Sequence, residues 1–386
     1  MQIITTTEAL AAFCERAAQH PFVTVDTEFL RERTYYSKLC LLQIAYPGDS
    51  EDAAAIVDPL AGGELSLAPL YDLFRNPDVV KVFHAARQDL EIFFVDAGVI
   101  PAPLFDTQVA AMVCGFGDQV SYETLVRKIA KAEVDKSSRF TDWSHRPLSE
   151  AQLRYALADV TYLRTVYVHL SERLKRTGRE HWVGEEMAVL MDPATYRTDP
   201  AKAWERVKTR PGSSKMMAAL VELARFREEY AQGKDVPRSR VFKDDALIEL
   251  ATTRPLSEAD LSKSRLLLRE GRRGDIAEGI LASVKRAAAY RPEDVPRLND
   301  SREQLQVNPA LADLLRVLLK AKSEGEGVAA RLIASSADLD AIAAGERDLP
   351  ALKGWRREVF GEEAIRLCEG KVALAAKGQN VVTVRL

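Results

Sequence analysis

Four acidic residues in three separated segments constrain the fold more than any other feature of the sequence. Asp26 and Glu28 stand two positions apart, and Asp89 lies in a second segment. In the third segment, Asp159 follows Tyr155 at a spacing of four. Hard divalent cations bind oxygen ligands, and a pair of ions needs several carboxylates that converge on one point. The sequence therefore predicts a fold that brings the three segments together around metal ions, an arrangement suited to phosphodiester cleavage.

The residues around the first three acids predict the elements that carry them. The apolar run Phe22–Val25 favours a strand. Residues two apart on a strand share a face, so Asp26 and Glu28 could aim at one point from the end of that strand. The segment Ala86–Val95 is typical of a helix, which would carry Asp89.

A longer helix is predicted to begin at Ser149, because Ser149 and Gln152 have the spacing of a capping box. An apolar stripe continues at helical spacing as far as Leu170, and Tyr155 and Asp159 lie off it. Residues four apart on a helix stack on one face, so the phenol and the carboxylate are expected about one turn apart. A phenol with an unperturbed pKa of about 10 is a poor base at neutral pH, so Tyr155 is better suited to orienting a water molecule.

The remaining elements of this half predict a mixed sheet. Thr5 and Glu8 resemble a capping box, and Ser66 favours the start of another helix. The other predicted strands are Leu39–Tyr46, Ala54–Val57 and Val79–Phe83. Strands in quick succession, followed by alternating helix and strand, predict an α/β domain with a mixed sheet flanked by helices.

Chain length and composition indicate a globular protein of two or three domains. The sequence has 386 residues, of which 47% are hydrophobic and 29% charged. Its apolar runs are far shorter than the ~18 residues that a membrane span needs, and the N-terminus lacks the pattern of a secretory signal. The four scattered cysteines show no disulfide or zinc spacing. We therefore expect a cytoplasmic protein that does not associate with membranes.

Basic residues are concentrated in the second half of the chain. The overall net charge of -3 argues mildly against a nucleic-acid-binding protein. Between Lys263 and Arg291, however, eight Lys or Arg accompany three acidic residues, which gives this stretch a net charge of +5. A basic region beside an acidic site suits a protein that holds a polyanion in one place and cleaves it in another.

The acidic segments resemble the exonuclease motifs of the DEDD superfamily in its tyrosine variant, and they are most similar to bacterial ribonuclease D. The three motif blocks are Val25–Phe29, Val82–Leu90 and Tyr155–Leu163. Further similarity lies at Phe105–Gln108 and Thr141–Leu148. The resemblance implies a ribonuclease H-like fold and 3′→5′ exonuclease action.

The resemblance also implies a role for each residue of the site. Two divalent ions, Mg²⁺ or Mn²⁺, would be bound by Asp26, Glu28, Asp89 and Asp159. One ion would lower the pKa of the attacking water, and the other would stabilise the leaving oxygen. Tyr155 would position that water. Asp106 could support the metal ligands from behind, and a helix cap or turn acid is an equally good interpretation.

The second half of the chain resembles HRDC domains, which are small helical bundles found in ribonuclease D and in some helicases. The match rests on Met216–Tyr230 and Asp235–Leu247, and Leu352–Phe360 is similar to a degenerate second copy. The predicted organisation is an exonuclease domain at 1–178, a linker at 179–208, an HRDC domain at 209–292 and a degenerate, all-α HRDC-like domain at 300–386.

Six further residues are candidate contacts to the substrate. They are His84, Trp143, Arg146, Arg238, Arg240 and Lys243. The last three fall in a predicted loop and could bind phosphates, although a solvated polar face explains them equally well. Aromatic rings can stack on bases, but Trp143 also fits a core position, and a structural histidine is the simpler interpretation of His84.

The predicted function is trimming of RNA 3′ ends, including precursor tRNA as the resemblance implies, by a monomer that releases nucleoside 5′-monophosphates. A DNA exonuclease of the same superfamily is an alternative, because the same carboxylates cleave DNA. It is disfavoured because 386 residues leave no room for a polymerase or helicase domain, and no P-loop motif is present. A non-catalytic RNA-binding protein is a third hypothesis, but buried like charges would destabilise such a fold without metal.

Overall fold

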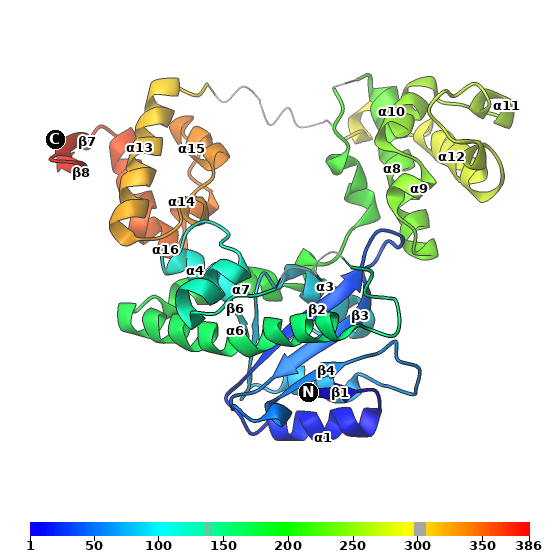
Figure 1. Ribbon diagram of the computed structural model, residues 1–386. Helices are drawn as coiled ribbons and strands as arrows, with labels where there is room; N and C mark the ends of the chain where they lie inside the picture. Colours follow the sequence, from blue (N-terminus) through cyan, green and yellow to red (C-terminus); the bar gives the residue numbers. More distant parts are fainter. Residues whose placement is uncertain (136–137, 139–140, 211, 297–305) are drawn as a thin grey trace. The chain divides into compact units, whose positions relative to one another are not determined.

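The computed structural model describes residues 1–135, 138, 141–210, 212–296 and 306–386. These residues form two compact units, whose elements are labelled in Figure 1. The first unit comprises the described residues of 1–29, 39–195 and 306–386, and the second comprises 30–38 and 196–296. The C-terminal region therefore clusters with the N-terminal half of the chain, and the second unit interrupts the first along the sequence.

A six-stranded mixed sheet lies at the centre of the N-terminal half. Its strands are β1 (Gln2–Ile4), β2 (Phe22–Leu30), β3 (Lys38–Ala45), β4 (Ala54–Val57), β5 (Val80–Phe83) and β6 (Leu104–Asp106). They are ordered β1-β4-β3-β2-β5-β6, with β1–β4, β2–β5 and β5–β6 parallel and β3–β4 antiparallel. The predicted α/β class is confirmed, and the short strands β1 and β6 were not predicted.

Strand β2 continues beyond the predicted end at Val25, so Asp26 and Glu28 lie inside the strand. Strands β3 and β5 flank it in the sheet, and its pairing with β5 involves Phe22–Thr24, the residues before the two acids. Exposure alternates along this part of the strand: Asp26 and Glu28 are half-buried, and Thr27 between them is buried. The two acidic side chains therefore share one face, as predicted.

In the described part of residues 1–195, seven α-helices accompany the sheet. They are α1 (Thr7–Ala17), α2 (Ala68–Arg75), α3 (Arg87–Ala97), α4 (Thr107–Val113), α5 (Tyr122–Leu125), α6 (Glu150–Thr177) and α7 (Glu180–Met191). The first helix is capped by Thr6, whose hydroxyl accepts a hydrogen bond from the Ala9 N–H, and not by Thr5. The Ser66 hydroxyl accepts from the Ala68 N–H, as a turn residue just before α2.

Helix α6 crosses the face of the sheet (Figure 1) and packs against β4 and β5. The predicted capping box of Ser149 and Gln152 is confirmed, since each side chain accepts a hydrogen bond from the backbone N–H of the other residue. The helix ends at Gly178, whose φ of 67° lies in the left-handed region that favours glycine. Within its apolar stripe, Val160 packs against the strand residues Ala45 and Ala54.

Helix α7 occupies part of the segment that was predicted as a linker, and it packs within the first unit. The Trp182 ring stacks on that of Trp355, with 4.8 Å between centroids and 17° between planes. The Trp355 Nε1–H donates to Glu186 Oε1 at 3.0 Å. These contacts attach the C-terminal region to the end of the sheet-containing region.

The C-terminal region is mostly helical but ends in a β-hairpin, so the all-α prediction is wrong for its last residues. Its elements are α13 (Pro309–Glu326), α14 (Ala330–Ile333), α15 (Ser336–Ala343), α16 (Gly354–Arg356), α17 (Glu362–Cys368), β7 (Val372–Lys377) and β8 (Asn380–Arg385). A two-residue turn led by Gly378, at φ +64°, joins the two strands. Apolar residues on both sides of such a turn are a hairpin pattern that the sequence already contained.

The second unit is a helical bundle built on one long helix. Its helices are α8 (Ser214–Lys234), α9 (Arg238–Val241), α10 (Asp244–Thr253), α11 (Glu258–Leu261) and α12 (Gly274–Ala287). Helix α8 packs against α10 and α12, and the shared core includes Leu220, Leu250 and Ile280. The segment 30–38 joins this bundle through Tyr35, whose hydroxyl donates to Glu228.

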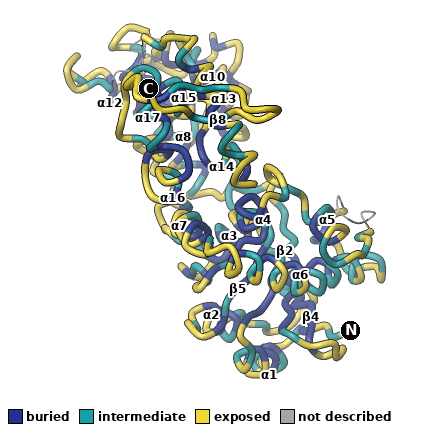
Figure 2. The backbone as a smooth tube through the Cα atoms, turned by 90° about the vertical axis from the view of Figure 1, so that its left-hand side faces the viewer, coloured by how far each residue is buried: buried dark blue, intermediate teal, exposed yellow. Residues whose placement is uncertain are grey.

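Buried residues follow the central strands and the inner faces of the helices (Figure 2). Across the part of the chain that the structure describes, every helix is too short or too polar to span a membrane.

Candidate active site

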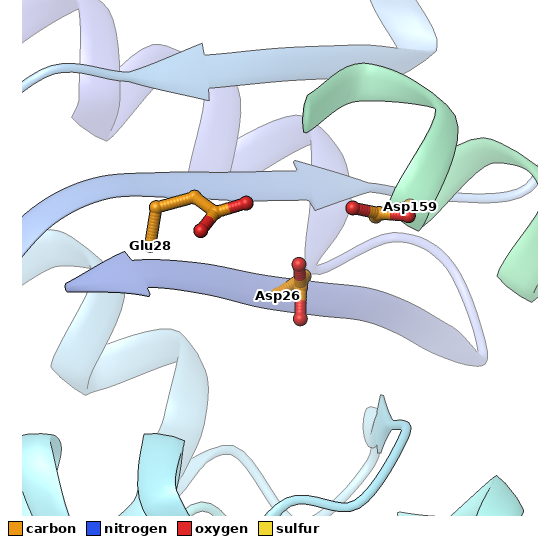
Figure 3. Close-up of side chains that lie close together, drawn as sticks. All are labelled: Asp26, Glu28 and Asp159. Carbon is orange, nitrogen blue, oxygen red and sulfur yellow. The ribbon is translucent and has the colours of Figure 1, made fainter. Parts of the chain in front are cut away.

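Three acidic side chains from two elements converge beside the central sheet. Asp26 and Glu28 come from β2 and Asp159 from α6, and Figure 3 shows their carboxylates facing one another. One ligand oxygen from each lies within 4.8 Å of the others. The structure therefore brings together residues that lie more than a hundred positions apart in the sequence.

Asp89 lies beside this group in the first turn of α3 and is only 6% exposed. The buried hydroxyl of Thr27 donates a hydrogen bond to Asp89 Oδ1. Thr27 is the residue between Asp26 and Glu28, so the strand that supplies these two acids also holds Asp89 in place. Sequence reasoning did not assign Thr27 a role, although its position inside the Asp-x-Glu motif placed it at the site.

Burial and mutual repulsion raise the pKa of the clustered carboxyls. Loss of solvent raises the pKa of Asp26 from 3.8 to about 7. Burial, followed by the charges of Asp26, Asp159 and Asp89, raises the pKa of Glu28 to about 10. The pKa of Asp89 also lies well above its ordinary value, mainly because of burial and then because of Asp26. At neutral pH the cluster will hold protons unless a cation takes their place.

The donor set of the cluster fits hard divalent ions. All three converging ligands are carboxylates, and Mg²⁺ and Mn²⁺ prefer carboxylate oxygen. Carboxylates this close repel one another, and bound divalent ions would neutralise that repulsion. Asp26, Glu28 and Asp159 are therefore suited to hold such ions, with Asp89 alongside.

Two hydroxyl groups hold α6 where Asp159 meets β2. The buried Thr24 hydroxyl on β2 donates to the Val160 carbonyl at 2.8 Å. The Tyr122 hydroxyl donates to the Ala158 carbonyl at 2.9 Å. The residues on either side of Asp159 are thus fixed by their backbone. Neither contact has a local sequence pattern, because each joins elements that are far apart along the chain.

Asp106 is a helix cap that also fixes the turn before α3. Its carboxylate caps α4, accepting from the Gln108 N–H at 2.8 Å. It also accepts from the N–H groups of Ala85 and Ala86 at 3.0 and 2.9 Å. Ala85 has a φ of +59°, which is unfavourable for a residue with a Cβ and is maintained by these bonds. Asp106 therefore sets the start of the helix that carries Asp89.

Tyr155 is half-buried one turn before Asp159, and its ring lies against Trp143. The two ring centroids are 6.0 Å apart, with 32° between the planes. Trp143 is only 3% exposed, so the indole is a support for Tyr155 more than a surface for a base.

His84 and Arg146, two other predicted substrate contacts, are engaged within the protein. His84 Nδ1 lies 3.0 Å from the Thr107 hydroxyl, and burial lowers the pKa of its imidazole, which favours the neutral ring. Arg146 forms an ion pair with Asp58 at 2.6 Å. Both side chains therefore have structural partners in this fold.

The three basic residues predicted in a loop lie in or next to short helices of the second unit. Arg238 and Arg240 lie in the short helix α9, and Lys243 is the residue before α10. A helical turn forms because the Phe242 N–H donates to the Arg238 carbonyl at 3.2 Å. Arg240 and Lys243 are exposed, whereas Arg238 lies 3.6 Å from the buried carboxylate of Glu228.

Comparison with known proteins agrees with this geometry. A profile of the 3′–5′ exonuclease family matches residues 1–175, and a profile of the HRDC domain matches residues 216–284. The fold and the acidic cluster thus define a 3′–5′ exonuclease with an HRDC domain.

Relatives similar over almost the whole chain show which family of 3′–5′ exonucleases this is. Ribonuclease D of Jannaschia sp. (strain CCS1) is 63% identical over 383 residues, which cover 99% of each chain. Ribonuclease D of Granulibacter bethesdensis is 48% identical over 98% of this chain and 95% of its own. The crystal structure of Escherichia coli RNase D has a TM-score of 0.81 at 30% identity, covering 96% of this chain and 98% of that one. The chain belongs to the ribonuclease D family and is a hydrolase, a 3′–5′ exoribonuclease of the DEDD type.

Proposed function

We propose that this enzyme removes nucleotides one at a time from RNA 3′ ends by two-metal-ion hydrolysis, releasing nucleoside 5′-monophosphates. The convergence of Asp26, Glu28 and Asp159 within 4.8 Å is the observation that supports this most directly. These three residues and Asp89 are the proposed ligands of Mg²⁺ or Mn²⁺. When bound, the ions would activate the attacking water and neutralise charge on the leaving oxygen.

The protein's own groups position the reaction. Asp26 and Glu28 present two carboxylates from one strand face, and the Thr27 hydroxyl holds Asp89 beside them. Tyr155, one turn from Asp159, is proposed to orient the water through its hydroxyl, and we assign it no role as a base, because an ordinary phenol is protonated at neutral pH. Holding the nucleophile and the scissile phosphate in line is the larger part of such catalysis.

The proposed substrate is structured RNA with a single-stranded 3′ end, such as a tRNA precursor. E. coli RNase D is described as an exoribonuclease involved in structured RNA processing, and it is similar to this chain over nearly its whole length. The basic stretch from Lys263 to Arg291 and the exposed Arg240 and Lys243 offer phosphate contacts in the HRDC-containing unit. We further propose that the enzyme is a cytoplasmic monomer; its four cysteines are all free thiols, as is usual in a reducing compartment.

A matched degradation assay tests the proposal. With Mg²⁺ or Mn²⁺, the protein should shorten a 5′-labelled RNA with a defined single-stranded 3′ end in single-nucleotide steps, and the same sequence as DNA more slowly. Asp159→Asn should bind the RNA and leave it intact. Internal fragments would contradict an exonuclease mechanism, and faster loss of the DNA would favour the DNA exonuclease alternative.

A further inference from the structure

Arg146 has no hydrogen-bond donor left for a substrate. A guanidinium carries five N–H groups, and five protein contacts engage it. Nε and Nη2 donate to the two carboxylate oxygens of Asp58 at 2.8 and 2.6 Å. Nη2 also donates to the Cys40 carbonyl at 2.8 Å. Nη1 donates to the carbonyls of Trp143 and His145 at 2.7 and 2.8 Å.

These contacts attach one loop to β3 and to the residue that follows β4. Cys40 is a buried residue of β3, and Asp58 follows β4 directly. Asp58 is itself fixed, because its N–H donates to the Ile4 carbonyl of β1 and its Oδ1 accepts from the Leu60 N–H. Its side chain is 7% exposed and that of Arg146 is 19% exposed. The ion pair is therefore largely sheltered from water.

The same loop carries Trp143, which supports Tyr155. Arg146 holds the Trp143 carbonyl, and the indole is packed against the Tyr155 ring. The loop is also tied to the start of α6, because Gln152 Nε2 donates to the Thr141 hydroxyl at 3.2 Å. A continuous set of contacts thus runs from β3 and the end of β4 through Arg146 and Trp143 to Tyr155.

We propose that Arg146 is a positioning residue for catalysis, acting through Trp143 to set the orientation of the Tyr155 phenol. This inference rests on the proposed role of Tyr155 as the residue that orients the water. Arg146 neutralises Asp58, draws the loop onto β3 and β4, and thereby presses the indole against one face of the tyrosine. Its donors are already engaged within the protein, so in this proposal Arg146 supports the site and does not contact the substrate.

The geometry of the contacts explains why arginine is needed. Only a planar fork can pair with both Asp58 oxygens and still reach carbonyls of β3 and of the loop. A lysine keeps the charge beside Asp58 but places its three donors on a single atom. Arg146→Lys should therefore preserve the fold while loosening the loop.

The test is steady-state kinetics on a single-stranded RNA with Arg146→Lys, Tyr155→Phe and the double variant. We expect Arg146→Lys to lower kcat about 10- to 100-fold, as small displacements of reacting groups do, and to leave KM within about twofold. In the Tyr155→Phe background, the same change should lower kcat by less than about twofold, because the residue it positions is already disabled. Arg154→Lys, a change at an exposed arginine that pairs with Glu150, is the control and should match the unmodified enzyme.

A second variant keeps the proposal testable if Arg146→Lys fails to fold. Trp143→Leu removes the ring and leaves the Arg146–Asp58 pair intact, and it should produce the same loss in kcat without a change in KM. Circular dichroism and Mn²⁺ titration should show a native fold and unchanged metal affinity in each variant.

The possible failures can be distinguished. A raised KM with unchanged kcat in Arg146→Lys would mean that Arg146 contacts RNA, and would overturn the inference. An equal loss of kcat with and without the Tyr155 hydroxyl would overturn it as well. Full activity of Tyr155→Phe, in which Arg146 is intact, would overturn the proposed role of Tyr155 and the inference that rests on it.

Discussion

The two units bury acidic side chains in opposite ways. In the first unit, Glu28 is surrounded by other carboxylates, and their charges add to burial in raising its pKa. In the second unit, Glu222 of α8 is 1% exposed, yet it accepts from Arg286 Nε at 2.6 Å and from the Tyr290 hydroxyl at 2.8 Å. Arg225 lies 3.2 Å from the same carboxylate.

As a consequence, the pKa of Glu28 is raised and that of Glu222 is lowered. Burial alone would raise the pKa of Glu222, but the hydrogen bonds from Arg286 and Tyr290, together with the charges of Arg225 and Arg286, outweigh burial and lower it. A buried carboxylate that has its own partners helps to hold the bundle together. A buried carboxylate whose neighbours are other acids destabilises the fold until a ligand arrives, and such uncompensated groups are typical of functional sites. The charge environment therefore separates the proposed metal-binding acids from the acids that have cationic partners.

The largest expected effect concerns an acid of the cluster. Asp26→Asn should lower kcat on the order of 10³-fold, because a lost metal ligand removes several kcal/mol of transition-state stabilisation. In metal-free buffer at pH 8 the same variant should unfold at a higher temperature than the unmodified protein, because one repelling charge is gone. Activity assays and thermal unfolding check both effects. Asp78→Asn, at an exposed turn, is the control, and a lower unfolding temperature for Asp26→Asn would contradict the comparison.

Removal of the buried acid Glu222 should lower stability, the opposite of the effect expected for Asp26. Glu222→Ala leaves Arg286 and Tyr290 without their acceptor, and we expect a loss of about 2 kcal/mol in the free energy of unfolding. Urea denaturation measures this loss. Glu278→Ala, at an exposed position on the helix that carries Arg286, should change stability by less than about 0.5 kcal/mol. If Glu222→Ala left the free energy of unfolding unchanged, the buried acid of the second unit would not stabilise the fold, and the comparison between the two units would be wrong.

Stability without metal should fall as the pH rises. A carboxyl whose pKa is raised in the folded state contributes stability below its ordinary pKa, and that contribution is lost as the pH rises through the folded value. For Asp26 this window extends from about pH 4 to about pH 7. We expect the unfolding temperature in chelator to drop by a few degrees between pH 5.5 and 8.5. Mg²⁺ should restore it more at pH 8.5 than at pH 5.5, because metal binding must displace protons. A rise in unfolding temperature with pH in chelator would contradict the shifted pKa values.

The smallest effect is expected from single exposed cations of the second unit. Arg240→Ala and Lys243→Ala should each weaken RNA binding a few-fold and reduce the slope of log K against log salt by about 0.7. Filter binding across a range of salt concentrations measures the slope. Lys377→Ala, at an exposed position in the C-terminal hairpin, is a matched control. Unchanged slopes in both variants would remove α9 and the start of α10 from the proposed RNA surface.

Local pattern was enough to place the elements that carry the acids. The capping box at Ser149, the left-handed glycine at Gly178 and the period of the α6 stripe depend on residues within one or two helical turns. The extension of β2 past Val25 was not predictable in the same way, because the length of a strand depends on its neighbours in the sheet as well as on its own residues. The hairpin that begins at Val372 has a glycine turn that local pattern could have predicted, but the resemblance to an all-α domain led to a helical prediction.

The sequence by itself determined the chemistry of the site: four carboxylates and a tyrosine at spacings that place them on a strand and two helices. Only the tertiary structure decided which polar residues serve them. Thr24, Thr27 and Asp106 form hydrogen bonds to distant backbone or side chains, and Arg146, a candidate substrate contact in the sequence, has all its donors engaged within the protein. A side chain's charge is written in the sequence, but the partners that neutralise or orient it come from elsewhere in the chain, and only folding brings them into contact.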